Sequence, residues 1–199
     1  MANRKTIIKR KTKETNIVIG LNLDGSGKAK IKTGIGFLDH MLTLFAKHGL
    51  FDLDVKAKGD LEVDNHHTNE DVGICLGQAF AKALGNKKSI SRYGYSFVPM
   101  DESLANVRVV LDISARPSLY FNKSAKISDA GEAYTIQDAK EFLKAFSGNS
   151  GINMHVDVLR GEDMHHIIEA MFKAFARAMK DAVKIDKRVK GIPSTKGKL

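Results

Sequence analysis

The chain has 199 residues, enough to bury one core or two small halves packed together. Its 43% hydrophobic and 28% charged residues exclude a disordered or fibrous protein and indicate a globular one. A formal net charge of +9 is compatible with nucleic acid, anionic lipid or an acidic small molecule as partner. Because tryptophan is absent and the basic residues are scattered, no base-stacking platform is evident, and a phosphorylated substrate explains the charge equally well.

The compartment follows from two further features. No apolar run approaches the roughly 20 residues of a membrane-spanning helix, and the first residues lack the apolar core of a signal peptide. Cys75 is the single cysteine, which excludes an intrachain disulfide and fits a reducing compartment. We therefore expect a cytoplasmic protein without a membrane partner.

In chain order, apolar residues first alternate with polar ones and then recur at helical spacing. The pattern predicts strands near residues 6–12, 16–23 and 29–32, a helix over 37–49, a strand over 51–56 and a helix over 66–84. It then repeats, with strands near 95–99, 106–113 and 118–121, a helix over 137–146, a strand over 152–158 and a helix over 164–183.

The two series look like copies of one unit. His66-His67-Thr68-Asn69-Glu70 opens the long helix of the first, and His165-His166-Ile167-Ile168-Glu169 opens that of the second. We predict an α+β protein of two quasi-identical halves, residues 1–87 and 88–199, each a β-sheet with two helices on one face. The join at residues 85–88 is too short for a linker, so the halves form one compact unit.

The doubled His-His-x-x-Glu motif is a candidate metal site. On a helix the glutamate can stand beside either histidine, whereas adjacent histidines point about 100° apart and so suit two different ions. Nitrogen and carboxylate ligands without thiolate favour Mn²⁺, Fe²⁺, Zn²⁺ or Ni²⁺ over a cysteine-based structural zinc. A solvated helix start is the alternative for a single copy, but two copies at matching places are less accidental.

Further candidates flank these motifs. His40 and Glu141 occupy matching positions of the two halves, and both residue types can bind a divalent cation, although a core histidine is the alternative for His40. Asp39, Asp64 and Asp71 could accept hydrogen bonds from imidazoles or serve as solvated caps.

The last residues, 191–199, combine glycine, hydroxyl and lysine groups that suit a phosphate, although basic tails are common. Arg92 and Arg116 are possible anion ligands or ordinary surface arginines.

Taken together, these motifs resemble those of a known protein family. Residues 36–42, 64–71, 92–94, 112–117, 165–174 and 193–197 are similar, in order, to the imidazoleglycerol-phosphate dehydratase family. The resemblance implies two halves that each have a fold like that of ribosomal protein S5 domain 2. It also implies a large homo-oligomer, a 24-mer built from trimers, with active sites at subunit interfaces. It also implies two Mn²⁺ ions per active site, with other divalent cations possible.

The same resemblance implies the site residues. The metal ligands would be His40, His66, His67, Glu70, Glu141, His165, His166 and Glu169. The substrate and its phosphate would be held by Glu14, Arg92, Arg116, Lys173, Ser194 and Lys196. Catalytic roles would fall to Glu14, His67 and Glu169. Many members have histidine in place of Glu141 and glutamine in place of Leu44, so metal preference and one substrate contact could differ.

The implied reaction, a step of histidine biosynthesis, dehydrates D-erythro-imidazole glycerol phosphate to imidazole acetol phosphate. The hydrogen to be lost is on carbon and scarcely acidic, so we expect two metal ions to stabilise the substrate's imidazole as imidazolate, which can expel the hydroxyl. Glu14 is the first candidate for proton transfer. The rival hypotheses are a metal-storage or delivery protein, and a basic nucleic-acid-binding module, which would leave the doubled motif without a reason.

Overall fold

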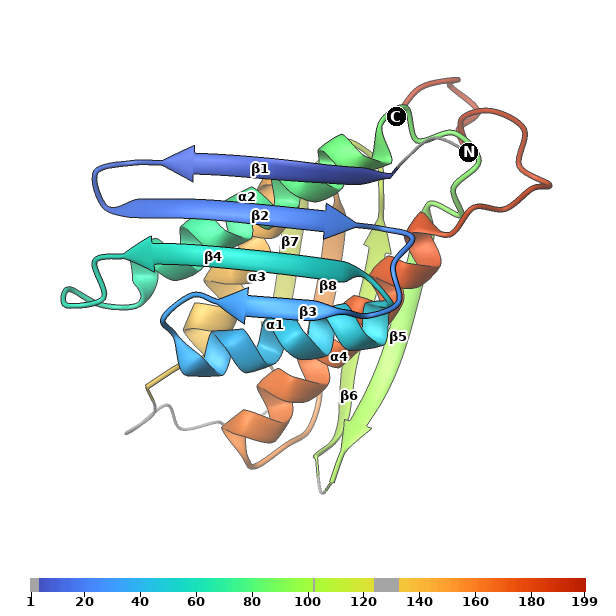
Figure 1. Cartoon of the computed structure of the whole chain (residues 1–199). Helices are drawn as coiled ribbons and strands as arrows, with labels where there is room; N and C mark the ends of the chain where they lie inside the picture. The colour runs from blue at the N-terminus through green and yellow to red at the C-terminus, as the bar shows by residue number, and fades with distance from the viewer. Residues whose placement is uncertain (1–3, 102, 124–132) are drawn as a thin grey trace.

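The computed structural model describes residues 4–101, 103–123 and 133–199 (Figure 1). The first half contains β1 (Lys5–Lys11), β2 (Thr15–Asn22), β3 (Ala29–Lys32), α1 (Gly36–Gly49), β4 (Asp52–Gly59) and α2 (His66–Leu84). The second contains β5 (Tyr93–Met100), β6 (Ser103–Asp112), β7 (Ser118–Lys123), α3 (Ile136–Ser150), β8 (Asn153–Val158) and α4 (Met164–Val183). The strand orders, β1-β2-β4-β3 and β5-β6-β8-β7, are the same, and in each the last pair, β4–β3 or β8–β7, is parallel while the other pairs are antiparallel. The predicted duplication is confirmed.

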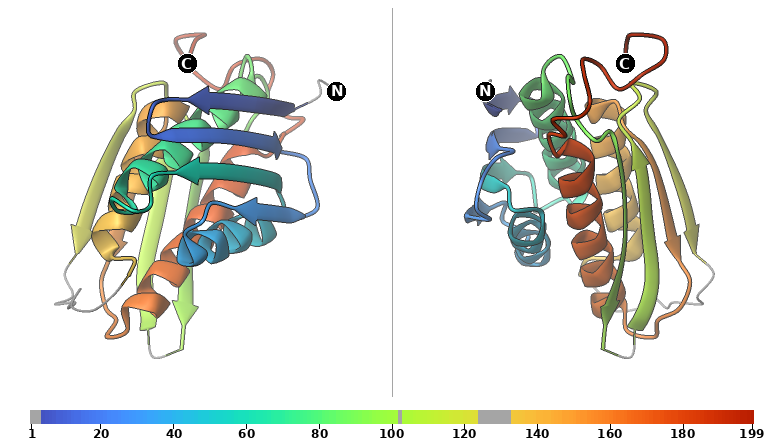
Figure 2. Two further views of the ribbon diagram at one scale, coloured as in Figure 1. Left: turned by 60° about the vertical axis from the view of Figure 1, so that its left-hand side comes forward. Right: turned by 90° about the vertical axis from the view of Figure 1, so that its right-hand side faces the viewer.

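The four helices lie between the two sheets, so that each sheet is covered on its inner face (Figure 2). α2 packs on α3 and α1 packs on α4, which joins the halves through their helices. One buried phenylalanine from each helix meets at the centre. The ring centroids of Phe45 and Phe175 are 4.7 Å apart, those of Phe175 and Phe146 4.9 Å, and those of Phe146 and Phe80 5.4 Å. The two halves therefore share one core.

The contact between α2 and α3 depends on two glycines one turn apart. A Cβ atom on Gly73 would lie 2.8 Å from the carbonyl oxygen of Phe142, and one on Gly77 2.5 Å from that of Phe146. Real Cβ contacts are not this short, so glycine permits the helices to approach at this distance. The start of α2, which carries the first histidine pair, is thereby held against α3.

The predicted element order is confirmed, with α2 and α4 beginning and ending close to the expected residues. In the first half β4 continues to Gly59, beyond the expected end at residue 56, and the larger differences lie in the second half. α3 continues to Ser150, beyond the expected end at Phe146, and so includes a polar last turn. The helix ends at Gly151, whose φ of 73° is left-handed. At its start, Thr135 and Asp138 form a capping box. β5 and β6 also extend further than the apolar alternation indicates.

The outer faces of the two sheets differ in chemistry. On the first sheet, the lysine face consists of exposed Lys9, Lys11, Lys32, Lys56 and Lys58. On the second, the aromatic face consists of Tyr93, Tyr95, Phe97, Val110 and Tyr120, of which Tyr95 is 68% exposed. Tyr95, Val110, His155 and Tyr120 form one row across the four strands, and the Tyr120 and His155 rings stack 4.5 Å apart. Within the described residues, no helix is long and apolar enough to cross a membrane.

Candidate active site

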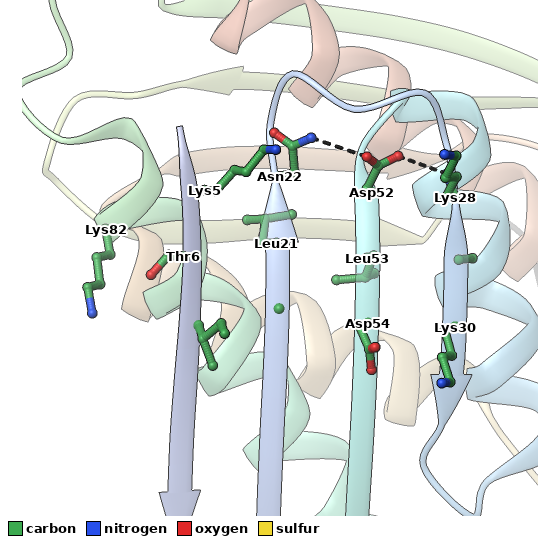
Figure 3. A pocket seen from close by; sticks show the side chains of 13 residues that line it. Lys5, Thr6, Leu21, Asn22, Lys28, Lys30, Asp52, Leu53, Asp54 and Lys82 are labelled. Atoms are coloured by element: carbon green, nitrogen blue, oxygen red, sulfur yellow. Dashed lines mark hydrogen bonds between the residues drawn. The ribbon is translucent and has the colours of Figure 1, made fainter. Parts of the chain in front are cut away.

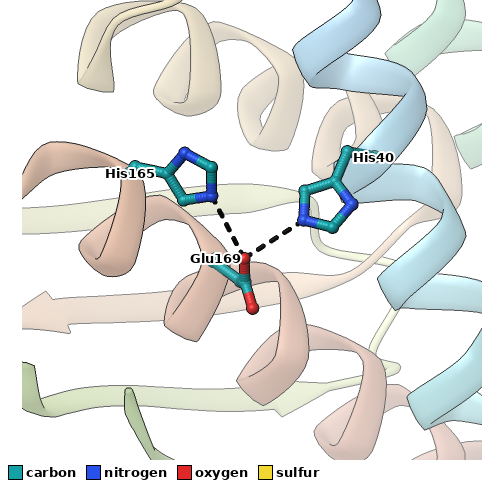
Figure 4. A group of neighbouring side chains, drawn as sticks. All are labelled: His40, His165 and Glu169. Carbon is teal, nitrogen blue, oxygen red and sulfur yellow. Dashed lines mark hydrogen bonds and ion pairs between the residues drawn. The ribbon is translucent and has the colours of Figure 1, made fainter. Parts of the chain in front are cut away.

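Three predicted metal ligands from the two halves meet where α1 packs on α4. His40 projects from α1, and His165 and Glu169 project from the first two turns of α4 (Figure 4). His40 Nε2 lies 3.1 Å and His165 Nε2 3.3 Å from the same Oε2 atom of Glu169. One donor atom from each of the three residues lies within 4.8 Å of the others. Two imidazole nitrogens and a carboxylate oxygen form a donor set suited to a divalent transition metal.

The surroundings of this triad keep Glu169 ionised. Lys173 Nζ lies 2.6 Å from the other carboxylate oxygen, Oε1. Burial raises the pKa of Glu169, but hydrogen bonds from Lys173 and His40 outweigh burial and bring the pKa below its ordinary value. Phe37 places its ring edge-on to His165 at 5.0 Å and stacks on Tyr134 at 5.2 Å. The imidazole of His165 is thus held by an aromatic side chain on one side and by Glu169 on the other.

The ligands predicted in the first half are not drawn together in the same way. His66 Nε2 lies 3.9 Å from Glu70 Oε2. Glu141, the counterpart of His40, instead accepts hydrogen bonds from Gln137 at 2.8 Å and Lys144 at 3.3 Å. Among the described residues, the triad of the second half is the one group of three potential ligands with donor atoms this close.

The adjacent histidines of each pair point to different partners. His165 turns to Glu169, whereas His166 Nε2 lies 3.8 Å from Asp101 Oδ2. In the first pair, His67 Nδ1 lies 2.9 Å from Asp60 Oδ2. This divergence is the geometry that the expected 100° offset predicts, since each histidine of a pair can serve a separate site.

Glu14 lies in the turn between β1 and β2 and lines a pocket of about 280 Å³ with Asp60 and Lys58. Asp60 connects this pocket to His67, with which it shares a hydrogen bond. The hydrogen bond that His67 shares with the accepting carboxylate of Asp60 raises the pKa of His67 above its ordinary value, and the charge of Glu14 raises it further against a lowering by burial. Glu14 is therefore close enough to His67 to interact electrostatically with it, and Asp60, which also lines the pocket, bonds to that imidazole.

Four predicted phosphate ligands share a second pocket, of about 760 Å³, at the other end of the molecule. It is lined by Arg92, Arg116, Ser194 and Lys196, among others. Arg92 donates to both oxygens of Asp112, at 2.7 and 3.1 Å, and to the carbonyl oxygen of Pro193 at 2.8 Å. The hydrogen bonds to Asp112 raise the pKa of Arg92. Arg92 thus anchors the last segment of the chain, while Arg116 is exposed.

The triad and this cationic pocket are separated by almost the length of α4. His165 lies at the start of the helix, whereas the backbone N–H of Arg92 donates to the carbonyl oxygen of Ala182 near its end, at 2.9 Å. At 1.5 Å of rise per residue, these positions are about 25 Å apart. Lys173, predicted as a phosphate ligand, lies with the triad. One small substrate cannot reach both places in a single chain.

A third hollow has none of the predicted residues. This pocket of about 830 Å³ lies over the outer face of the first sheet and includes Lys5, Asn22, Lys30 and Asp52 (Figure 3). Asp52 is bonded there to Asn22 and to the backbone of Lys28. No histidine of the described part of the chain lines this pocket, so it does not offer the imidazole ligands of the predicted metal site.

Sequence reasoning missed the residue that bonds to His67, and the aspartates it named have other partners. Asp39 instead accepts from Thr33, Asp64 from the backbone of His66, and Asp71 from Arg10 and Thr15. The carboxylate that contacts the imidazole of His67 is instead Asp60, in the loop after β4. Asp60 lies before the helix that carries His67, so helical spacing does not apply to the pair and gave no reason to single Asp60 out.

Comparison with known proteins places the chain among the hydro-lyases, enzymes that remove water from a substrate. More specifically, the chain belongs to the imidazoleglycerol-phosphate dehydratase family, whose family model matches residues 33–179. The imidazoleglycerol-phosphate dehydratase of Acetivibrio thermocellus is 60% identical over 99% of this chain and 100% of its own length. That of Thermoanaerobacter pseudethanolicus is 60% identical over 98% of both chains.

Solved structures of the family have the same fold. The enzyme from Pyrococcus furiosus, in complex with (S)-C348, superposes with a TM-score of 0.81 at 38% identity, covering 96% of this chain and 100% of that one. The enzyme from Staphylococcus aureus gives a TM-score of 0.75 at 38% identity, covering 91% of this chain and 99% of that one. The expected fold class and enzyme class are therefore confirmed.

Proposed function

We propose that this chain dehydrates imidazole glycerol phosphate to imidazole acetol phosphate in histidine biosynthesis, as a cytoplasmic enzyme. The observation that carries the proposal is the meeting of His40, His165 and Glu169 across the two halves in a chain of this family. A metal-storage protein would also use such ligands, but it would have no use for a pocket lined by two arginines, Ser194 and Lys196.

The donor atoms of the triad fit a divalent cation, and we propose Mn²⁺, two ions per active site. The first would be held by His40, His165 and Glu169. The remaining predicted ligands, His66, His67, Glu70, Glu141 and His166, would complete the sites together with ligands of other copies of the chain. When bound, the ions would act as Lewis acids that stabilise negative charge on the substrate's imidazole ring.

The side chains of the chain supply proton transfer and orientation. Glu14 faces the hollow beside His67, where a carboxylate can take the carbon-bound proton and return a proton to the departing hydroxyl, which leaves as water. The resulting enol tautomerises to the ketone, so the net change is loss of one water. Arg116, Ser194 and Lys196 would bind the phosphate and fix the substrate's reacting carbon relative to Glu14.

Two features support active sites between copies of the chain, in a homo-oligomer that we propose to be the 24-mer of the family. The triad and the cationic pocket lie about 25 Å apart along α4, so a second copy must bring its pocket to the triad of the first. The aromatic face exposes an apolar patch of the kind that marks protein–protein contacts. Tyr93 belongs both to this face and to the cationic pocket, so a contact there adjoins the site.

Turnover of imidazole glycerol phosphate by metal-stripped protein, before and after addition of Mn²⁺, tests the proposal. We expect imidazole acetol phosphate to form only after metal is restored. A folded, metal-loaded protein that still leaves the substrate unchanged would contradict the proposed activity and favour metal storage.

A further inference from the structure

We propose that Asp60 is a positioning residue that orients the imidazole of His67 and selects its Nε2 atom as the metal ligand. The proposal rests on the proposed function, because that is where His67 becomes a metal ligand. Asp60 lies in the loop between β4 and α2 and is not itself one of the proposed metal ligands.

The geometry defines the tautomer. His67 Nδ1 and Asp60 Oδ2 are 2.9 Å apart, and an ionised carboxylate can only accept a hydrogen bond. Nδ1 therefore carries the hydrogen, and Nε2 keeps its lone pair for a metal ion. The carboxylate also makes the imidazole a more basic ligand, because negative charge at Nδ1 favours electron donation from Nε2.

The backbone on both sides of this hydrogen bond is fixed by packing. A Cβ atom on Gly59 would lie 1.9 Å from the hydroxyl oxygen of Thr68, and the Thr68 side chain is fully buried. Gly59 therefore lets the first turn of α2 rest directly on the end of β4. Asp60 and His67 are the chain neighbours of these two residues, so the contact between Gly59 and Thr68 also sets the separation of the carboxylate and the imidazole.

The hydrogen bonds of Asp60 indicate a role directed at His67. Its Oδ1 atom is buried and has no hydrogen-bond partner among the described residues. A carboxylate that served to hold the loop would use both oxygens, because an unpaired buried oxygen opposes folding. Among the described residues, the side chain of Asp60 accepts its hydrogen bond from the imidazole of His67.

The duplication provides an internal comparison. The chain enters β4 at Phe51 and β8 at Ile152 through the same backbone hydrogen bond to the preceding helix. When the two halves are aligned at the first residues of β4 and β8, Asp60 matches Gly161, and when they are aligned at the two histidine pairs, it matches Leu159. None of these residues, nor Arg160 between them, has a carboxylate. The contact between Asp60 and His67 is therefore a feature of the first half that the matching loop of the second half does not repeat at the same position.

The test measures Mn²⁺ binding to the metal-stripped full chain by the electron paramagnetic resonance of free Mn²⁺. We expect Asp60→Ala to weaken the affected site about 10- to 100-fold, the usual effect of removing such a support. Asp60→Asn should be intermediate, because its carbonyl oxygen accepts the same hydrogen without the charge. The control is Asp54→Asn, which removes an equal charge from an exposed position of β4 and should bind Mn²⁺ as wild type does.

A second measurement is independent of metal and of activity. Nitrogen-15 spectra of the metal-free protein should show an imidazole protonated at Nδ1 in wild type that is lost in Asp60→Ala. If both Asp60 variants bind Mn²⁺ as wild type does, or if this tautomer is unchanged, the positioning role is wrong, while wild-type turnover would still uphold the proposed function. Failure of the wild-type protein itself to bind Mn²⁺ and turn over substrate would instead overturn the proposed function, and this role with it.

Discussion

Lys173 donates a hydrogen bond of 2.6 Å to Glu169 from one turn further along α4, and this pair lies deeper than the histidines beside it. The Lys173 and Glu169 side chains are 15% and 9% exposed, whereas His165 is 52% exposed. Without metal, the lysine is therefore the main compensation for a largely buried carboxylate. A bound cation would take over part of that compensation.

The first prediction follows from this pair. Lys173→Met should lower the free energy of unfolding of the metal-free protein by about 1–3 kcal/mol, because Glu169 loses its cation where water does not replace it. Added Mn²⁺ should then raise the melting temperature more in the variant than in wild type. Lys144→Met is the control: Lys144 is 67% exposed in its pair with Glu141 and should contribute little. Equal melting temperatures for both metal-free variants would contradict this account.

The cationic pocket gives the second prediction. Lys196→Ala should raise the KM for imidazole glycerol phosphate about 10- to 100-fold, the worth of one charge-assisted hydrogen bond, with a smaller change in kcat. Steady-state kinetics measure both values. Arg188→Ala removes an equal charge from a residue that is 89% exposed and paired with Asp186, and it should leave KM unchanged. An unaltered KM in the Lys196 variant would remove the last segment of the chain from the site.

Helix packing gives the third. Gly77→Ala should destabilise the protein by about 1–3 kcal/mol, because the new Cβ would lie 2.5 Å from the Phe146 carbonyl oxygen. Gly148→Ala, in α3, meets nothing within 4 Å and should stabilise by up to about 1 kcal/mol through helix propensity. Chemical denaturation of both variants makes the comparison. Stabilisation by both substitutions would show that the α2–α3 contact tolerates a wider spacing.

The fourth concerns Asp52, whose pKa is lowered to about 2, first by the hydrogen bond from the Ser26 backbone and then by those from Lys28 and Asn22. The folded pKa lies below the unfolded value of about 3.9, so the carboxylate stabilises the fold above pH 4, and this contribution is lost as pH falls toward 2. Asp52→Asn should therefore cost stability at pH 7 and little near pH 2. Chemical denaturation of Asp52→Asn at both pH values measures this difference, and Asp54→Asn, at an exposed position of β4, is the control. A loss of stability that is the same at both pH values would contradict a stabilising role for the charge of Asp52.

Local patterns predicted the elements and their order because apolar spacing and cap residues act over a few positions. Both histidine-bearing helices begin as expected, since each motif opens a helix whose apolar face is continuous. The longer α3 was not predictable in this way. Its last turn is polar, and Ser147 stabilises it by donating to the carbonyl oxygen of Ile152 at 2.6 Å, beyond the helix end.

The sequence names candidate residues for the site, but it does not predict their arrangement. The repeat makes His40 and Glu141 equivalent, yet His40 meets Glu169 while Glu141 is bonded to Gln137 and Lys144. Which helix packs on which is decided by core residues such as Phe45 and Phe175, far from the ligands in sequence. The same holds for Asp60, whose contact with an imidazole depends on how closely α2 approaches the end of β4.

The helix layer between the sheets makes this chain resemble an intramolecular dimer. Each half has a complete sheet and two helices, but the apolar side of those helices is covered by the helices of the other half, at the four phenylalanine rings. A chain divided within residues 85–88 would give two fragments that each expose this surface. Separately they would aggregate; refolded together, they would have every contact needed to reassemble, so that docking of the halves becomes a bimolecular and concentration-dependent step.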